Sequence, residues 1–170
     1  MSRVLDVVLA AAGLALAVPL LLIAAIAIKL DSRGPVVYRQ RRVGKDGRQF
    51  EVLKLRTMRP GADPVGGLLR RFSLDEIPNL VNVLRGELAI VGPRPTLAAQ
   101  VERYTDHQRR RLEVKPGITG WAQVNGRAGI PWEERIELDV WYVDNRSLGL
   151  DLRILARTAR LLLSGHGLYG

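Results

Sequence analysis

The sequence predicts an α+β protein that is mostly helical, with an N-terminal re-entrant membrane helix (residues 1–30) and a small cytoplasmic domain (residues 31–170). Three observations lead to this prediction. The 22 residues from 7 to 28 carry no charge, two β-prone runs follow them, and the remainder is basic and largely helix-forming. We expect one β-hairpin and amphipathic helices that lie at the membrane surface.

The composition excludes several kinds of chemistry. The chain has 26 Lys and Arg against 17 Asp and Glu, a net charge of +9, with no cysteine and two histidines. A disulfide framework, thiolate-bound zinc, an iron–sulfur cluster and a cysteine nucleophile are therefore excluded. A catalytic metal is expected to be a hard cation on oxygen ligands, Mg²⁺ first. The basic excess predicts a polyanionic partner: nucleic acid, anionic lipid or a phosphorylated small molecule.

The uncharged N-terminal segment predicts insertion into a membrane. As a helix, 22 residues extend about 33 Å, enough for a bilayer core of about 30 Å. A cleaved signal peptide is disfavoured, because no A-x-A site with a polar flank follows and basic residues lie on both sides. A buried core helix is disfavoured too, because the rest of the chain is too short to surround a segment that is apolar all round.

Two topologies remain for this segment, a full span and a re-entrant helix that returns to the same side. Basic residues flank both ends, with Arg3 before the segment and Lys29 and Arg33 after it. Both flanks prefer the cytoplasmic face, which a single span cannot provide. Pro19 removes one helix hydrogen bond in the middle of the segment and bends the helix. These features favour the re-entrant form, with the basic domain in the cytoplasm.

The remaining elements follow from periodicity and from turn residues. We expect strands at 36–43 and 48–55 joined by Gly44-Lys45-Asp46-Gly47, a loop at 58–67, a helix at 74–84, a strand at 87–91, a helix at 96–112, a loop at 116–129, and helices at 133–142 and 150–163.

The last of these helices is amphipathic. One face carries three arginines, Arg153, Arg157 and Arg160. The other face is apolar and carries Leu148, Leu152, Leu155, Ala159 and Leu162. Such a helix either lies flat on an anionic membrane or packs on a core with its basic face in water.

The stretch Ser73-Leu74-Asp75-Glu76 is the most informative in the sequence. One interpretation is a capping box, with Ser73 as N-cap and Glu76 three residues later. Pro78 conflicts with a helix that starts this early, so the helix can also begin nearer Ile77. In both cases Asp75 lies at a helix N-terminus, which keeps a carboxylate anionic and attracts phosphate oxygens. An ionised aspartate there can bind Mg²⁺, attack phosphorus, or do both.

Basic residues on stiff segments accompany this acidic pair. They end the second predicted strand, directly precede Ser73, or lie in loops rich in proline and glycine: Lys54 and Arg56, Arg70 and Arg71, Arg94 between two prolines, and Arg127. Each alone can be an ordinary surface charge. Together they predict a clamp for a diphosphate.

Three long motifs carry a resemblance to a known family. KLRTM (54–58), SLDEIPNLVNVLRGELAIVGPRP (73–95) and KPGITGWAQVNGR (115–127) resemble the bacterial sugar transferases, monotopic phosphoglycosyl transferases that begin surface-glycan assembly. The resemblance implies a ping-pong reaction. An aspartate attacks the β-phosphate of a UDP-sugar and releases UMP, and a polyprenyl phosphate such as undecaprenyl phosphate then takes the sugar 1-phosphate. It also implies a location at the bacterial inner membrane, with the catalytic domain on the cytoplasmic face.

Residue by residue, the resemblance implies that Asp75 is the nucleophile and an Mg²⁺ ligand and that Glu76 completes the catalytic pair. It implies phosphate binding by Lys54, Arg70, Arg94 and Arg127. A homodimer is compatible with it, and no nucleic acid is expected as a partner. The family's re-entrant helix bends at Ser-Pro, where this chain has Val18-Pro19. Segment 59–72 is shorter than usual in the family, and we expect the minimal form without a preceding domain.

Two other functions fit part of the sequence. A membrane-tethered module that binds nucleic acid without catalysis would explain the charge, but aromatic residues are only 5% of the chain and no nucleic-acid motif is present. A catalytically inactive scaffold of the same family is the second alternative, and the intact Asp75-Glu76 pair argues against it.

Overall fold

The computed structural model describes residues 1–58, 64–126 and 129–164. Its α-helices are α1 (Arg3–Asp31), α2 (Pro64–Arg71), α3 (Asn79–Arg85), α4 (Ala98–Val101), α5 (Asp106–Arg109), α6 (Trp121–Asn125), α7 (Trp132–Asn145) and α8 (Leu148–Leu163). Single 3-10 turns are η1 (Lys45–Gly47), η2 (Leu74–Glu76) and η3 (Arg110–Leu112). The strands are β1 (Val37–Val43), β2 (Gln49–Leu55), β3 (Ala89–Val91) and β4 (Gly117–Thr119). A mostly helical α+β fold is confirmed.

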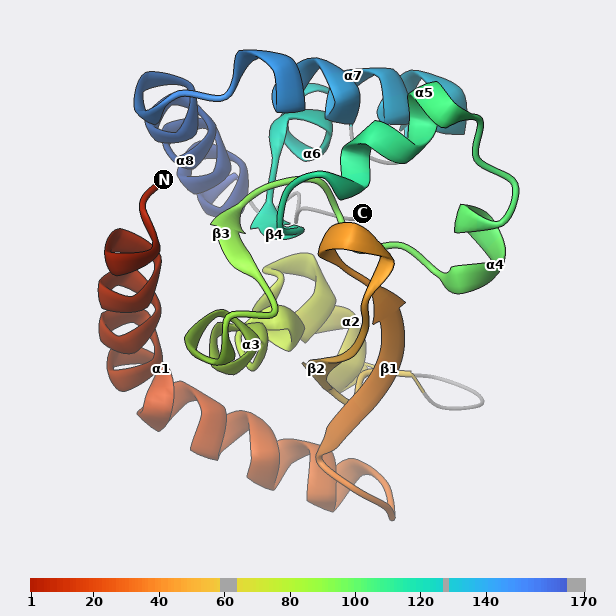
Figure 1. Cartoon of the computed structure of the whole chain (residues 1–170). Coiled ribbons are helices and arrows are strands. Elements are labelled where there is room, and N and C mark those ends of the chain that lie inside the picture. The colour runs from red at the N-terminus through yellow and green to blue at the C-terminus, as the bar shows by residue number, and fades with distance from the viewer. Residues whose placement is uncertain (59–63, 127–128, 165–170) are drawn as a thin grey trace.

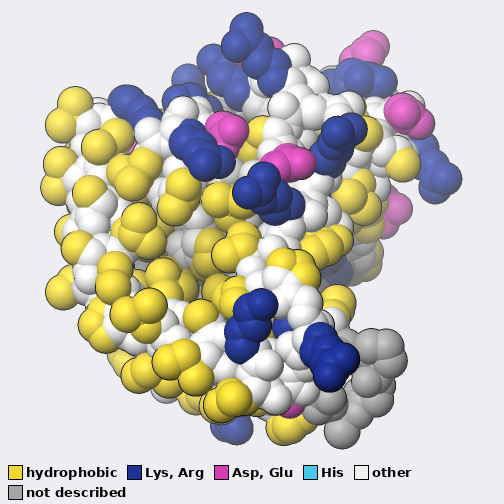
Figure 2. Space-filling model, turned by 90° about the horizontal axis from the view of Figure 1, so that it is seen from below, with side chains coloured by type: hydrophobic (Ala, Val, Ile, Leu, Met, Phe, Trp, Pro, Cys, Tyr) yellow, Lys and Arg dark blue, Asp and Glu magenta, His cyan; other side chains and the backbone are white. Residues whose placement is uncertain are grey.

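Helix α1 curves around the outside of the molecule and changes direction near its middle (Figure 1). Pro19 lies inside this helix, as the predicted bend requires. The most apolar window of α1 has a mean hydropathy of 2.7, and only 11% of that window is buried. Large apolar side chains are exposed along the helix, including Leu16, Leu22, Ile23 and Ile26. Figure 2 shows hydrophobic side chains gathered along this side of the molecule. By length and composition α1 can therefore cross a membrane.

The predicted hairpin is confirmed. β1 and β2 pair antiparallel, from Val37 opposite Leu55 to Val43 opposite Gln49. The chain reverses through η1, where Asp46 and Gly47 have φ of 55° and 76°. A glycine tolerates positive φ without a steric penalty, which explains the residue at position 47.

The predicted loop at 116–129 is wrong in its described part. β4 pairs in parallel with β3 in the centre of the molecule (Figure 1), and α6 follows directly. A three-residue strand has too few residues to show alternation, and its partner lies far away in the sequence. The two backbones approach so closely that a Cβ on Gly117 would lie 2.1 Å from the Gly92 nitrogen. Only glycine fits there.

Two further predictions need correction. The predicted loop at 58–67 contains the start of α2, because Pro64 has the φ of a first helical residue and Leu69 packs against Ala24, Ile28 and Leu55. The predicted helix at 96–112 is broken into α4, α5 and η3. Thr105 starts a new helix there, because its hydroxyl accepts a hydrogen bond from the Gln108 backbone N–H at 3.3 Å.

Helix α8 packs through a face that the sequence analysis did not identify. Its buried residues are Leu150, Asp151, Ile154 and Thr158. Leu148 and Leu152, on the predicted leucine face, are exposed. The Arg157 guanidinium lies 5.0 Å from the centre of the Trp121 ring. The helix therefore contributes to the core and still presents apolar side chains at the surface.

Helix α1 contributes to two separate hydrophobic clusters. Ala10 lies in a buried cluster with residues from α3, β3, α7 and α8, among them Val83 and Ile154. Ala24 and Ile28 lie in a second cluster with Leu55 of β2 and Leu69 of α2. Both halves of the bent helix are thus fixed to the rest of the chain by apolar burial.

Asn82 of α3 connects this helix to the hairpin. Its side chain is fully buried, accepts from the Leu53 N–H at 3.1 Å and donates to the Glu51 carbonyl at 2.7 Å. It also donates to the Glu87 carboxylate at 2.7 Å. These bonds fix the position of α3 relative to β2.

We predict that Asn82→Ala lowers the free energy of unfolding by about 2–3 kcal/mol, because it removes three hydrogen bonds of a buried side chain and leaves partly buried backbone groups of the hairpin without this partner. Denaturant unfolding in detergent measures this change. Asn145→Ala is the matched control: Asn145 is exposed and donates to the Trp141 carbonyl of its own helix at 2.9 Å, so the change should stay within about 0.5 kcal/mol. Equal effects of both substitutions would contradict the assigned role.

Candidate active site

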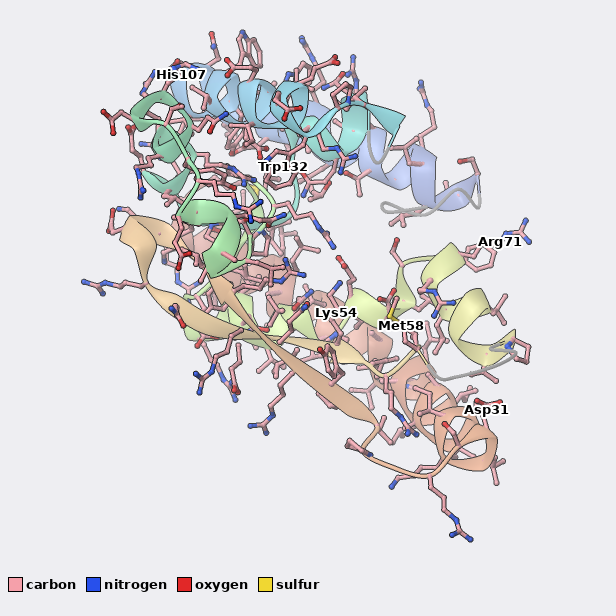
Figure 3. All side chains as sticks on the ribbon, turned by 90° about the vertical axis from the view of Figure 1, so that its right-hand side faces the viewer. Asp31, Lys54, Met58, Arg71, His107 and Trp132 are labelled. Carbon is pink, nitrogen blue, oxygen red and sulfur yellow. The ribbon has the colours of Figure 1, made fainter. Side chains whose placement is uncertain are left out.

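A cavity of about 940 Å³ opens beside the hairpin, between β1, β2, α2 and η2. Among the residues that the structure describes, the charged ones in its lining are six cations and two carboxylates: Arg42, Lys54, Arg56, Arg70, Arg71 and Arg94, with Asp75 and Glu76. In Figure 3, Lys54, Met58 and Arg71 lie in one half of the molecule, away from the helices that carry His107 and Trp132. A cavity of this size and charge suits a phosphorylated ligand.

The acidic pair lies in the η2 turn rather than in a capping box. Ser73 has left-handed backbone angles, φ 54° and ψ 24°, and its side chain makes no capping bond. The capping-box interpretation is therefore wrong. Helix α3 begins at Asn79, after Pro78, as the alternative with the later start predicted. A serine in the left-handed region costs about 1–3 kcal/mol, and such strain is typical of functional sites.

Glu76 is buried and holds two of the cavity's cations. Its side chain is 4% exposed, and its Oε1 accepts from Lys54 Nζ and, at 3.3 Å, from Arg94 Nη2. Lys54 ends β2, whereas Arg94 lies after β3. A buried carboxylate that accepts from two cationic donors fixes where those donors lie.

Asp75 is buried beside Glu76, and its electrostatics differ from the prediction. Burial raises the pKa of the Asp75 carboxyl, and the neighbouring Glu76 charge raises it further, while Lys54 and Arg94 oppose the shift. The expectation that a helix N-terminus favours the anionic form of Asp75 is therefore wrong in direction, because desolvation by burial has the largest effect on this pKa. A cation bound beside this carboxyl would oppose the shift and favour the ionised form.

The structure brings together the predicted phosphate ligands that it describes. Lys54, Arg70 and Arg94 all line the cavity with the acidic pair. Arg70 Nη1 also donates to the Thr57 carbonyl, which attaches α2 to the end of the hairpin. Arg127 lies outside the described residues.

Sequence analysis missed a polar row on β1. Tyr38, Gln40 and Arg42 line the cavity, and Gln40 Oε1 accepts from Arg42 at 3.2 Å (Nε) and 2.7 Å (Nη2). Burial lowers the pKa of the Arg42 guanidinium, and the nearby Arg94 charge lowers it further. The sequence signal that could have identified this row is the period-two alternation of a strand, because alternate residues share a face. Tyr38 pairs with Lys54, so residues 38, 40 and 42 lie on the same face as that lysine.

Comparison with known proteins identifies the family. The sequence model of the family described as bacterial sugar transferase matches residues 1–165 of this chain. An uncharacterized sugar transferase, EpsL, from Bacillus subtilis is 48% identical over 159 residues, which cover 86% of this chain and 78% of the relative.

Two further relatives have named activities. A UDP-glucose:undecaprenyl-phosphate glucose-1-phosphate transferase from Caulobacter vibrioides is 44% identical, covering 99% of this chain and 72% of the relative. A UDP-N-acetylgalactosamine-undecaprenyl-phosphate N-acetylgalactosaminephosphotransferase from Aeromonas hydrophila is 37% identical, and the match covers 98% of this chain and 44% of the relative. The family match extends over nearly the whole chain, including α1 and every described wall of the cavity, so the protein belongs to the bacterial sugar transferase family.

Proposed function

We propose that the protein transfers a sugar 1-phosphate from a UDP-sugar to undecaprenyl phosphate or a similar polyprenyl phosphate, releasing UMP, as the first membrane step of surface-glycan assembly. The observation that carries this proposal is the buried Asp75-Glu76 pair in the wall of a strongly cationic cavity. The relatives from C. vibrioides and A. hydrophila differ in the named sugar and share the named lipid carrier. That pattern supports the polyprenyl phosphate as acceptor.

The proposed reaction has two displacements at one phosphorus. The Asp75 carboxylate attacks the β-phosphorus, the bond from this phosphorus to the bridging oxygen breaks, and UMP leaves. A phosphate oxygen of the polyprenyl phosphate then attacks the same phosphorus and releases Asp75. Cations are needed in both steps, because negative charge grows on the leaving group. Lys54, Arg70, Arg94 and Arg127 are the proposed phosphate ligands, and Glu76 holds two of them.

Mg²⁺ is the proposed cofactor, with Asp75 as its protein ligand. In the described part of the chain, no three acidic or histidine side chains gather into a metal site. Mg²⁺ is commonly held by one or two carboxylates together with substrate phosphates, which is the donor set that Asp75 and a diphosphate provide. When bound, the ion supplies charge neutralisation at the phosphates.

The proposed setting is the cytoplasmic face of the bacterial inner membrane. Residues 1–30 form the membrane-inserted, re-entrant part, and residues 31–170 form the catalytic domain. The bend of α1 and its exposed apolar side chains support insertion from one side. A polyprenyl phosphate keeps its head group at the membrane surface, so the site has to lie there too.

Replacing the proposed nucleophile tests the mechanism. We predict that Asp75→Asn abolishes UMP release, because an amide cannot attack phosphorus, and that the fold and membrane association are retained. Mass spectrometry of the wild type mixed with UDP-sugar alone should find a phosphosugar adduct on Asp75. Full turnover of Asp75→Asn would disprove the covalent mechanism.

Removing one cavity cation tests the phosphate clamp. Arg94→Ala should lower turnover by about ten- to a hundredfold, because a charge-assisted bond contributes about 1.5–3 kcal/mol and about 1.4 kcal/mol equals a factor of ten. Arg94→Lys should recover only part of this loss, since an ammonium lacks the guanidinium fork. Arg153→Ala, on the exposed face of α8, is the control and should leave turnover in detergent unchanged. Equal, modest losses in both alanine variants would show an effect of net charge alone.

The topology of α1 is tested by labelling. If the helix is re-entrant, tags before Arg3 and after Gly170 should both be accessible from the cytoplasm only. An impermeant reagent applied to intact cells and to permeabilised cells makes the comparison. Labelling of the N-terminal tag in intact cells would mean that α1 spans the membrane and that Pro19 is only a kink.

A further inference from the structure

A buried ion pair lies behind the loop that carries Arg94. Arg111 of η3 and Asp139 of α7 have side chains that are each 3% exposed, and Arg111 Nη2 donates to Asp139 Oδ2. Neither residue lines the cavity. The proposed function gives them no role.

The contacts of Arg111 lead to the Arg94 loop. Its Nη2 donates to the backbone carbonyl of Arg94 at 3.0 Å, and its Nη1 donates to the Tyr104 hydroxyl at 2.6 Å. That hydroxyl donates to Thr96 Oγ1 at 3.1 Å. From the helical side, the Arg111 guanidinium thus holds Arg94 directly and Thr96 through the Tyr104 hydroxyl.

The same segment is held from the hairpin side. The Val43 N–H donates to the Thr96 carbonyl at 2.8 Å, and Arg42 Nη1 reaches the Pro95 carbonyl at 3.5 Å. Pro93 and Pro95 have no N–H of their own, so two backbone donors are missing here. The Arg94 backbone depends on donors from distant parts of the chain.

Stability alone does not account for this buried pair. Moving two charges out of water is costly, and a buried pair offsets this cost only when its remaining polar atoms are bonded. Within residues 1–58, 64–126 and 129–164, Arg111 Nε and Asp139 Oδ1 are buried and have no hydrogen-bond partner. The pair is therefore poorly optimised for stability.

We propose that Arg111 and Asp139 are positioning residues for the transfer reaction. Asp139 orients the Arg111 guanidinium, which fixes the Arg94 carbonyl, and this directs the Arg94 side chain toward Glu76 and the cavity. This inference rests on the proposed function. Arg111 acts through Arg94 and does not touch the substrate.

A volume-matched double replacement separates positioning from stability. Arg111→Met/Asp139→Leu removes both charges together, a change that is often neutral or stabilising for a fold. We expect a thermal midpoint close to that of the wild type. We expect kcat for UMP release to fall by about tenfold or more, because small displacements of a charge-stabilising group are costly.

A double-mutant cycle identifies the route through Arg94. In the Arg94→Ala background the double replacement should cause no further loss of kcat, because the proposed route to the substrate runs through the Arg94 side chain. Arg110→Ala/Asp144→Ala is the matched control. It breaks an exposed pair between the same two elements, η3 and α7, and should leave kcat unchanged.

Arg111→Lys serves as the second variant if the double replacement does not fold. It keeps a cation for Asp139 but cannot bond the Arg94 carbonyl and Tyr104 together, so kcat should fall while the thermal midpoint is retained. Wild-type kcat in either folded variant overturns the proposal. The proposal is also overturned if the double replacement lowers kcat by the same factor in the Arg94→Ala background as in the wild type.

Wild type and Asp75→Asn are assayed in the same series. If UMP release depends on Asp75 and kcat is unchanged in the folded positioning variants, the inference on Arg111 and Asp139 is rejected and the proposed function stands. UMP release that does not depend on Asp75 rejects the proposed function and this inference with it.

Discussion

The Glu76 carboxylate joins parts of the chain that are far apart in sequence. It is buried, and it accepts from Lys54 at the end of the hairpin and from Arg94 after β3. A buried carboxylate without these donors would be strongly destabilising, so the hairpin, η2 and the Arg94 loop must meet at this point. The same contacts place two cations beside Asp75. The requirement that Glu76 be neutralised therefore determines the geometry of the cavity.

The Arg94 loop also connects the two halves of the molecule. On one side it pairs with the hairpin through Val43 and Thr96, and on the other it receives Arg111 from the helical layer of η3 and α7. Close backbone packing of Gly92 against Gly117 holds its beginning. The helical layer is thus in direct hydrogen-bond contact with the loop that supplies Arg94 to the cavity.

Helix α1, the apolar helix, packs against the elements that form the cavity. Its bend lets one helix contribute Ala10 to the cluster behind α3 and Ala24 with Ile28 to the cluster beneath β2 and α2. η2 and α3 follow one another in the chain, so the helix that meets the membrane also supports the turn that carries the acidic pair. The proposed transfer from a soluble nucleotide sugar to a membrane lipid requires such a connection between an apolar helix and the cavity.

Local sequence determined the elements whose signal lies within a few residues. The uncharged N-terminal segment, the hairpin turn at 44–47, the long helices and the acidic pair were all predicted from such patterns. Only the tertiary structure decided what depends on distant partners: the β3–β4 pairing, the left-handed Ser73 and the raised pKa of Asp75. Propensity and periodicity report on neighbours along the chain. Burial, desolvation and ion pairing depend on which segments meet in space, and no local pattern contains that information.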